Sequence, residues 1–190
     1  MTLRFIAIAG SVKETSINRR LLAVATQAVI DAGAEVNVVN LLDYPLPVFS
    51  EDEEANEIPE NITKFKALIR QTDGYLIASP EYNGSLTPLL INTIAWLSRK
   101  HGDEPRMEAF TGKVAAVMSA SPGGLGGIRA LPHLRYVLEG IGVLIIPEML
   151  TLGNAHSAFE DDGTLKDEKF QERVDAMAQN LVRVTSKLQS

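Results

Sequence analysis

Short apolar runs alternate with longer amphipathic segments along the whole chain. The apolar runs are rich in β-branched residues and largely uninterrupted, which is typical of strands buried on both faces of a parallel sheet. We therefore predict strands at 3–9, 35–40, 74–79, 113–119 and 143–147, with a possible extra piece at 148–152.

The segments between these runs repeat apolar residues at intervals of three and four, as the buried stripe of a helix does. The stripes are Ile17, Leu21, Val24 and Ala28; Ile62, Phe65 and Ile69; Leu90, Ile94 and Leu97; and Phe170, Val174, Met177, Leu181, Val184 and Leu188. Thr87 followed by Pro88 has the pattern of an N-cap and a first helical turn. Five strands and five helices in strict alternation predict a doubly wound α/β sandwich, with 1–190 as a single domain.

One segment, 43–59, breaks this alternation. It contains three prolines, and five acidic residues fall within 51–57. We interpret it as a solvated surface loop. The alternative is that Tyr44 to Phe49 covers the site of a neighbouring subunit.

Composition narrows the classes of function. The 190 residues carry a net charge of -6 and no block of Lys and Arg, so a nucleic-acid groove is not expected. The absence of cysteine excludes disulfides, thiolate metal sites and cysteine nucleophiles. Without a secretion signal or a long apolar run, we expect a cytoplasmic location. His101, His133 and His156 are scattered, so we expect solvated or helix-surface histidines and no metal site.

Three chemically unusual segments follow the first, third and fourth predicted strands. They are GSVKETSIN at 10–18, PEYNGS at 80–85 and SASPGGLGG at 119–127. In an open parallel sheet, ligands bind beyond the carboxyl ends of the strands, where these segments converge. Each segment taken alone could be an ordinary turn, so their convergence is the main evidence for a binding site.

The first segment has the donors that a phosphate requires. It matches neither a Walker loop nor a dinucleotide fingerprint, but the hydroxyls of Ser11 and Ser16, the Lys13 ammonium and the Asn18 amide can surround a terminal phosphate. The helix that begins near Ile17 adds the positive end of its dipole.

The other two segments suit a flat ring. Tyr82 offers an aromatic face just after Pro80 ends a strand, and nearby backbone groups can bind a ring edge. Four glycines within 123–127 allow the backbone to approach a ligand closely. A flat heteroaromatic ring with a phosphate tail describes flavin mononucleotide (FMN).

The same segments carry a resemblance to a family. Gly10 to Asn18 is similar to G-S-x-R-x-x-S-x-N, Pro80 to Asn83 reads P-E-Y-N, and 119–127 stands where the family has S-x-x-G-x-x-G-G. The segment NTIAWLSR at 92–99 is similar to N-A-x-D-W-L-S-R. Over residues 3 to about 150, the chain resembles the NAD(P)H-dependent FMN reductases, flavodoxin-like proteins that include chromate, quinone and azoreductase-type members.

The resemblance implies a three-layer sandwich with strand order 2-1-3-4-5 and a bound FMN. It implies that the phosphate is held by Ser11, Lys13, Ser16, Ile17 and Asn18. It implies that the ring is held by Pro80, Glu81, Tyr82, Asn83 and the backbone near Ser119, Ala120, Ser121 and Gly123.

The implied reaction is a ping-pong transfer in which NADPH or NADH reduces the flavin. The reduced flavin then passes electrons to a quinone, a free flavin, an azo compound or an oxidised metal ion. The flavin carries this chemistry, so no catalytic side chain is expected. The family also implies a homodimer or homotetramer, with Arg129 and Glu148 as candidate interface residues.

Two positions depart from the family pattern. Lys13 replaces the usual Arg, and we predict weaker FMN binding because an ammonium lacks the planar fork of a guanidinium. Ala95 replaces the usual acid before Trp96, so no ionic role is expected there.

Two other functions remain open from the sequence. A flavodoxin-type electron carrier would bind FMN without oxidising NAD(P)H, but such carriers have a T/S-x-T-G-x-T loop that this chain lacks. A non-enzymatic protein that kept the fold and lost the cofactor is the second alternative, and failure to take up FMN would identify it.

Overall fold

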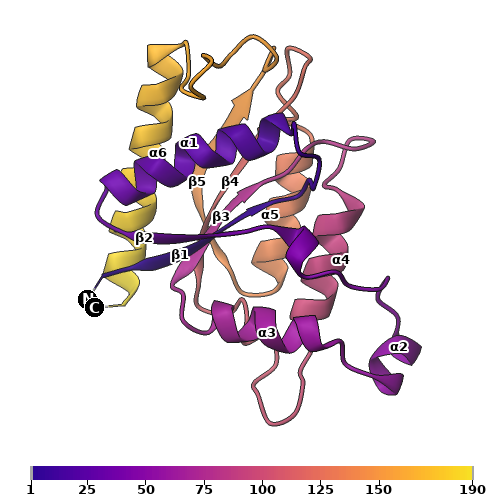
Figure 1. Ribbon diagram of the computed structural model, residues 1–190. Coiled ribbons are helices and arrows are strands. Elements are labelled where there is room, and N and C mark those ends of the chain that lie inside the picture. The colour runs from indigo at the N-terminus through magenta and orange to yellow at the C-terminus, as the bar shows by residue number, and fades with distance from the viewer. Residues whose placement is uncertain (1, 190) are drawn as a thin grey trace.

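A five-stranded parallel sheet forms the centre of the computed structural model, which describes residues 2–189 (Figure 1). Its order, β2-β1-β3-β4-β5, confirms the predicted 2-1-3-4-5 arrangement. The strands are β1 Arg4–Ala9, β2 Glu35–Val39, β3 Gly74–Ala78, β4 Val114–Ala120 and β5 Leu144–Leu152.

Helices cover both faces of the sheet, as predicted (Figure 1). α1 and α6 pack on one face, while α3, α4 and α5 pack on the other. The helices are α1 Ile17–Asp31, α2 Glu51–Asn56, α3 Glu60–Ile69, α4 Pro88–Leu97, α5 Ala130–Gly140 and α6 Glu168–Leu188, and a 3-10 turn, η1, spans Leu41–Asp43.

The central strands are buried on both faces because side chains alternate across a strand. In β1, Phe5 packs under α1 and α6, while Ile6 packs under α3 and α4. Every residue of β3 and β4 is buried. This explains why these strands read as continuous apolar runs rather than as alternating ones.

The predicted strand at 143–147 and the extra piece at 148–152 form one strand, β5. Its pairing with β4 shifts between Ala115, which is opposite Ile145, and Val117, which is opposite Met149. Two additional residues of β5 are accommodated at this irregularity. Pro147 lies within it, where the missing N–H of proline breaks no ladder bond.

The prediction of a solvated segment at 43–59 is confirmed for most of its residues, but part of it is helical and its aromatic side chains pack on the chain. Residues 51–56 form the short helix α2, which buries no side chain. The preceding residues pack on their own chain: Tyr44 stacks on Phe65 with ring centroids 4.9 Å apart, and Phe49 meets Trp96 edge-on at 5.1 Å. The Trp96 Nε1–H donates to the Pro47 carbonyl at 2.9 Å. Tyr44 to Phe49 is thus held against α3 and α4.

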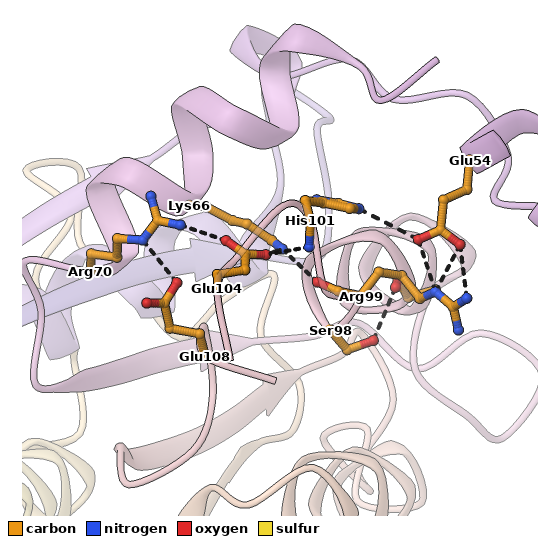
Figure 2. Close-up of polar contacts among 9 residues, drawn as sticks. Glu54, Lys66, Arg70, Ser98, Arg99, His101, Glu104 and Glu108 are labelled. Atoms are coloured by element: carbon orange, nitrogen blue, oxygen red, sulfur yellow. Dashed lines mark hydrogen bonds and ion pairs between the residues drawn. The ribbon is translucent and has the colours of Figure 1, made fainter. Parts of the chain in front are cut away.

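A network of ion pairs joins α2, α3 and the segment that connects α4 to β4 (Figure 2). At its centre the Lys66 ammonium pairs with the Glu104 carboxylate, and both side chains are buried. His101 lies between this pair and Glu54, so the expectation of a solvated histidine is wrong at this position. The network comprises Glu54, Lys66, Arg70, Arg99, His101, Glu104 and Glu108.

None of the helices between residues 2 and 189 is long and apolar enough to cross a membrane. Within the same residues, no three His, Cys, Asp or Glu side chains gather in a way that could hold a metal ion.

Candidate cofactor-binding site

The three unusual segments meet at one hollow of about 210 Å³, where β1, β3 and β4 end. Most of the predicted cofactor-binding residues line it. They are Ser11, Lys13, Ser16, Ile17, Asn18, Pro80, Glu81, Tyr82, Ala120 and Ser121. The structure places the other three, Asn83, Ser119 and Gly123, outside this lining.

The first loop leads directly into α1. Ser16 has an extended backbone and caps the helix, because its hydroxyl accepts a hydrogen bond from the Arg19 N–H at 3.4 Å. The Ser16 N–H donates to the Lys13 carbonyl at 3.1 Å, which closes the loop. The N–H groups of Ile17 and Asn18 open the first helical turn, where no carbonyl of the helix can accept them. This end of α1 is therefore suited to bind an anion.

The Asn18 side chain has a structural partner. Its Nδ2 donates to the Ala120 carbonyl at 2.8 Å, and its Oδ1 accepts from the Ala120 N–H at 2.9 Å. The residue is buried, so this pair fastens the start of α1 to the end of β4. One of the two N–H groups on Nδ2 remains, as does the backbone N–H, so the contact between Asn18 and a phosphate stays a prediction.

The second loop is a two-residue hairpin turn. Tyr82 and Ser85 exchange backbone hydrogen bonds of 2.9 and 3.0 Å, while Asn83 and Gly84 have positive φ angles of 53° and 77°. Two successive positive φ angles favour Asn-Gly at these positions. The turn leaves Tyr82 52% exposed beside the hollow and carries Asn83 away from it.

Glu81 links the second loop to the third. Its carboxylate accepts from the Arg129 Nε at 2.7 Å and from the Arg129 backbone N–H at 3.1 Å. The Glu81 side chain is nearly buried, whereas Arg129 is largely exposed. The carboxylate is therefore held by its own chain, and Glu81 presents mainly its backbone to the hollow.

The third loop depends on glycine. Gly127 has a φ angle of 79°, and a methyl group on it would overlap the Ser119 hydroxyl. Ser119 itself is completely buried at the end of β4, and its hydroxyl has no hydrogen-bond partner within residues 2–189. Ser119 thus lies beneath the loop rather than on the surface of the hollow.

Sequence reasoning missed three residues of the lining, Thr15, Pro122 and His156. Thr15 and Pro122 fall inside the first and the third of the unusual segments. His156 comes from the segment after β5; it is exposed, as expected for a solvated histidine, and it also lines the hollow. Its position shortly after a strand end was the signal, since the carboxyl ends of all parallel strands meet at one edge.

The other surface histidine behaves as expected. His133 lies on α5, and its Nδ1 is 3.0 Å from the Ser85 hydroxyl. It does not line the hollow.

Comparisons with characterised proteins agree with this geometry. The family model described as NADPH-dependent FMN reductase matches residues 3–157. An NAD(P)H-dependent FMN reductase of Pseudomonas aeruginosa is 34% identical over 181 residues, which cover 94% of this chain and 93% of that protein. A quinone reductase of Pseudomonas putida is 36% identical over 162 residues, covering 84% of this chain and 83% of that one.

The similarity extends beyond bacteria and to solved structures. An NAD(P)H:quinone oxidoreductase of Solanum tuberosum is 34% identical over 187 residues, with 95% of this chain and 92% of that protein covered. The flavoenzyme FerB of Paracoccus denitrificans, an NAD(P)H:acceptor oxidoreductase, superimposes with a TM-score of 0.84 at 28% identity and 98% coverage of both chains.

Proposed function

The chain belongs to the NADPH-dependent FMN reductase family, and we propose that it passes electrons from NADPH or NADH through a bound FMN to small acceptors. The family comprises enzymes that use FMN and NAD(P)H. Quinones are the first acceptors to test, because relatives along nearly the whole chain are quinone reductases. Free flavins, azo compounds and oxidised metal ions are further candidates.

The observation that carries the proposal is the convergence of three separate loops at one hollow. Its phosphate end combines the Lys13 ammonium, the hydroxyls of Ser11 and Thr15, and the first-turn N–H groups of Ile17 and Asn18. Two hydrogen-bonding hydroxyls, one cation and a helix N-terminus together fit a phosphate dianion. The residues present therefore fit FMN.

The ring end combines an exposed aromatic face with backbone groups. Tyr82 and Pro80 would pack against the flavin ring, and the backbone of Glu81 and the third loop would lie along its edge. When bound, FMN would accept a hydride from the nicotinamide and then pass the electrons on to the acceptor. The chain positions the ring, and protons can come from solvent. We therefore propose no catalytic side chain.

Ping-pong transfer requires that one substrate leave before the next arrives. The hollow is open to solvent, and Tyr82 at its rim is half exposed, so both substrates can reach the same ring face in turn.

We also propose that the chain forms a homodimer or a homotetramer. Arg129 and Glu148 remain the candidate interface residues, although each has a partner in its own chain: Arg129 pairs with Glu81, and Glu148 accepts from the Asn180 amide at 2.7 and 2.9 Å. Light scattering coupled to size exclusion, on the native protein and on Arg129→Ala, tests this proposal.

Steady-state oxidation of NADPH in the presence of a quinone tests the proposed reaction. For ping-pong transfer, double-reciprocal plots of the initial rate against NADPH concentration should give parallel lines at several quinone concentrations. A protein that binds FMN but does not oxidise NADPH or NADH would instead be an electron carrier.

A further inference from the structure

A second hollow, of about 410 Å³, adjoins the proposed phosphate site. It lies between α1 and the end of the edge strand β2, and it shares Ser11 and Ser16 with the first hollow. The phosphate loop therefore contributes to the walls of both hollows. FMN accounts for the first of them and leaves the second without a ligand.

The inner surface of the second hollow is apolar. Leu22 and Ala23 of α1 line it, and Val38 of β2 contributes a side chain that is 60% exposed. An edge strand has no neighbour on one side, which explains why Val38 is not covered. The volume of the second hollow is within the roughly 300–1,000 Å³ that small-ligand pockets occupy. A flat base could cover this apolar surface and remove it from water.

The rim of the second hollow is polar. Arg19 lies in the first turn of α1, and its guanidinium has no partner among residues 2–189. The neighbouring Arg20 differs, because its guanidinium lies 4.4 Å from the centroid of the Phe159 ring and donates to the Glu160 carbonyl at 3.2 Å. Arg19 is thus the cation available to a ligand.

Two further groups suit a sugar. The Glu14 carboxylate lines the hollow, and so does Asn40, whose Oδ1 accepts from the Leu42 N–H while its amide N–H groups remain. A carboxylate beside a bound nucleoside can accept hydrogen bonds from its ribose hydroxyls. Thr26 lies deeper along the same wall, and its buried hydroxyl has no partner within residues 2–189.

We infer that the second hollow is a binding site for an adenylate group, with the base on the surface of Leu22, Ala23 and Val38 and the phosphate at Arg19. The inference rests on the proposed function, because it takes the first hollow as the flavin site. A dinucleotide that places its flavin phosphate in the loop of Ser11 and Ser16 carries its adenylate into the adjoining space. The protein should therefore accept flavin adenine dinucleotide (FAD) as well as FMN.

Adenylate is also part of NADPH and NADH. A separate measurement must therefore distinguish binding of the adenylate of FAD from binding of the adenylate of the nicotinamide substrate. The flavin route is favoured because Ser11 and Ser16 are common to both hollows. A nicotinamide dinucleotide would have to reach the ring from beyond the phosphate loop.

The test is a titration of flavin-free, full-length protein with FMN and, separately, with FAD, followed by flavin fluorescence. Native protein is compared with Arg19→Ala. The matched control is Arg106→Ala, which removes the same charge from the segment between α4 and β4, at the opposite edge of the sheet. Steady-state KM values for NADPH and NADH are measured on the same variants loaded with FMN.

We expect FAD to bind the native protein at least as tightly as FMN does. Arg19→Ala should weaken FAD binding about tenfold, as loss of one charge-assisted contact does, and FMN binding less than about threefold. Arg106→Ala should change neither. If Arg19→Ala instead raises the KM for NADPH without changing FAD binding, the adenylate site serves the nicotinamide substrate.

Other outcomes overturn the inference. Binding of FMN without FAD, together with unchanged KM values in Arg19→Ala, would leave the proposed function intact and exclude an adenylate site. Equal weakening of FMN and FAD would show that Arg19 acts on the flavin phosphate alone. Failure of both flavins to bind would refute the proposed function and this inference together.

Discussion

At the residue scale, the candidate site separates side chains that face a ligand from side chains that hold the loops. Lys13 lines the hollow, whereas the Asn18 amide is used by Ala120 and the Glu81 carboxylate by Arg129. The residue types alone do not distinguish these roles. An amide beside a phosphate loop and an amide bonded to a neighbouring strand have the same sequence signature.

Lys13→Arg should tighten FMN binding. A guanidinium can donate two parallel hydrogen bonds to a phosphate, whereas the ammonium acts as a point charge. We expect the Kd for FMN to fall several-fold, roughly 1 kcal/mol in binding free energy. Titration of flavin-free protein measures it, and an unchanged or higher Kd would remove Lys13 from the phosphate site.

Gly127→Ala should destabilise the protein by about 3 kcal/mol, because the new methyl group would overlap the Ser119 hydroxyl at a φ angle that disfavours L-residues. Gly163→Ala is the matched control, since its φ angle of 92° is also positive but no atom lies within 4 Å of the added methyl group. The control should lose only about 1 kcal/mol. Urea unfolding compares the two variants. Equal losses in the free energy of unfolding would contradict an overlap between the added methyl group and the Ser119 hydroxyl.

The residue scale also shows where prediction from sequence ends. Ten of the thirteen predicted site residues line one hollow, because strand ends and loop composition fix where those segments lie. The other residues depend on conformation: a hairpin turn directs Asn83 away, and the third loop covers Ser119 at Gly127. His156 was missed because the segment after β5 has no recognisable motif.

At the scale of elements, two kinds of polar connection hold helices in place. Asn18 joins α1 to β4 at the carboxyl edge of the sheet. The ion-pair network of Figure 2 joins α2, α3 and the segment after α4. Neither connection could be predicted from periodicity, since each pairs residues that lie far apart in the sequence.

Asn18→Ala should destabilise the protein by about 2–4 kcal/mol, because it leaves the buried N–H and carbonyl of Ala120 without partners. Asn61→Ala is the control: its amide also donates to a carbonyl, that of Pro45, but the residue lies at the surface. The control should change the free energy of unfolding by less than about 1 kcal/mol. A similar small effect for Asn18→Ala would show that this pair does not hold α1.

The pKa of Glu104 is lower than its ordinary value of 4.5. Burial alone would raise this pKa, but hydrogen bonds from the Lys66 ammonium and the His101 N–H, with the charges of Lys66 and Arg70, outweigh burial. A carboxyl whose pKa is lower in the folded state stabilises the protein above pH 4.5, and this stabilisation is lost as the pH falls through the lower, folded-state pKa.

Glu104→Gln should therefore remove part of the acid dependence of stability below pH 4.5. At pH 7 it should also lower the free energy of unfolding by about 3 kcal/mol, because Lys66 loses its buried partner. Glu60→Gln, which breaks an exposed pair with Lys64, is the control and should change stability by less than about 1 kcal/mol. Urea unfolding at a series of pH values measures the free energy of unfolding of each variant. An unchanged acid dependence in Glu104→Gln would contradict the lowered pKa of Glu104.

At the scale of the whole molecule, the alternation of apolar runs and amphipathic stripes predicted the fold well. The five strands and the two helical layers are as expected, because buried parallel strands and their covering helices leave strong periodic signals. The sheet order is the one that the family resemblance implied. The segment 43–59 was not predictable in this way. Its prolines and acidic residues suggested solvent, yet Tyr44 and Phe49 pack on α3 and α4 through contacts without any period.

The central claim is that the three loops at the carboxyl edge of the sheet hold an FMN that accepts hydride from NADPH or NADH. The visible spectrum of the purified protein, recorded before and after anaerobic addition of NADPH, tests this claim most directly. We predict a flavin spectrum that bleaches on addition and returns with a quinone or air. A flavin spectrum that does not bleach, or a colourless protein that takes up no FMN, would contradict it.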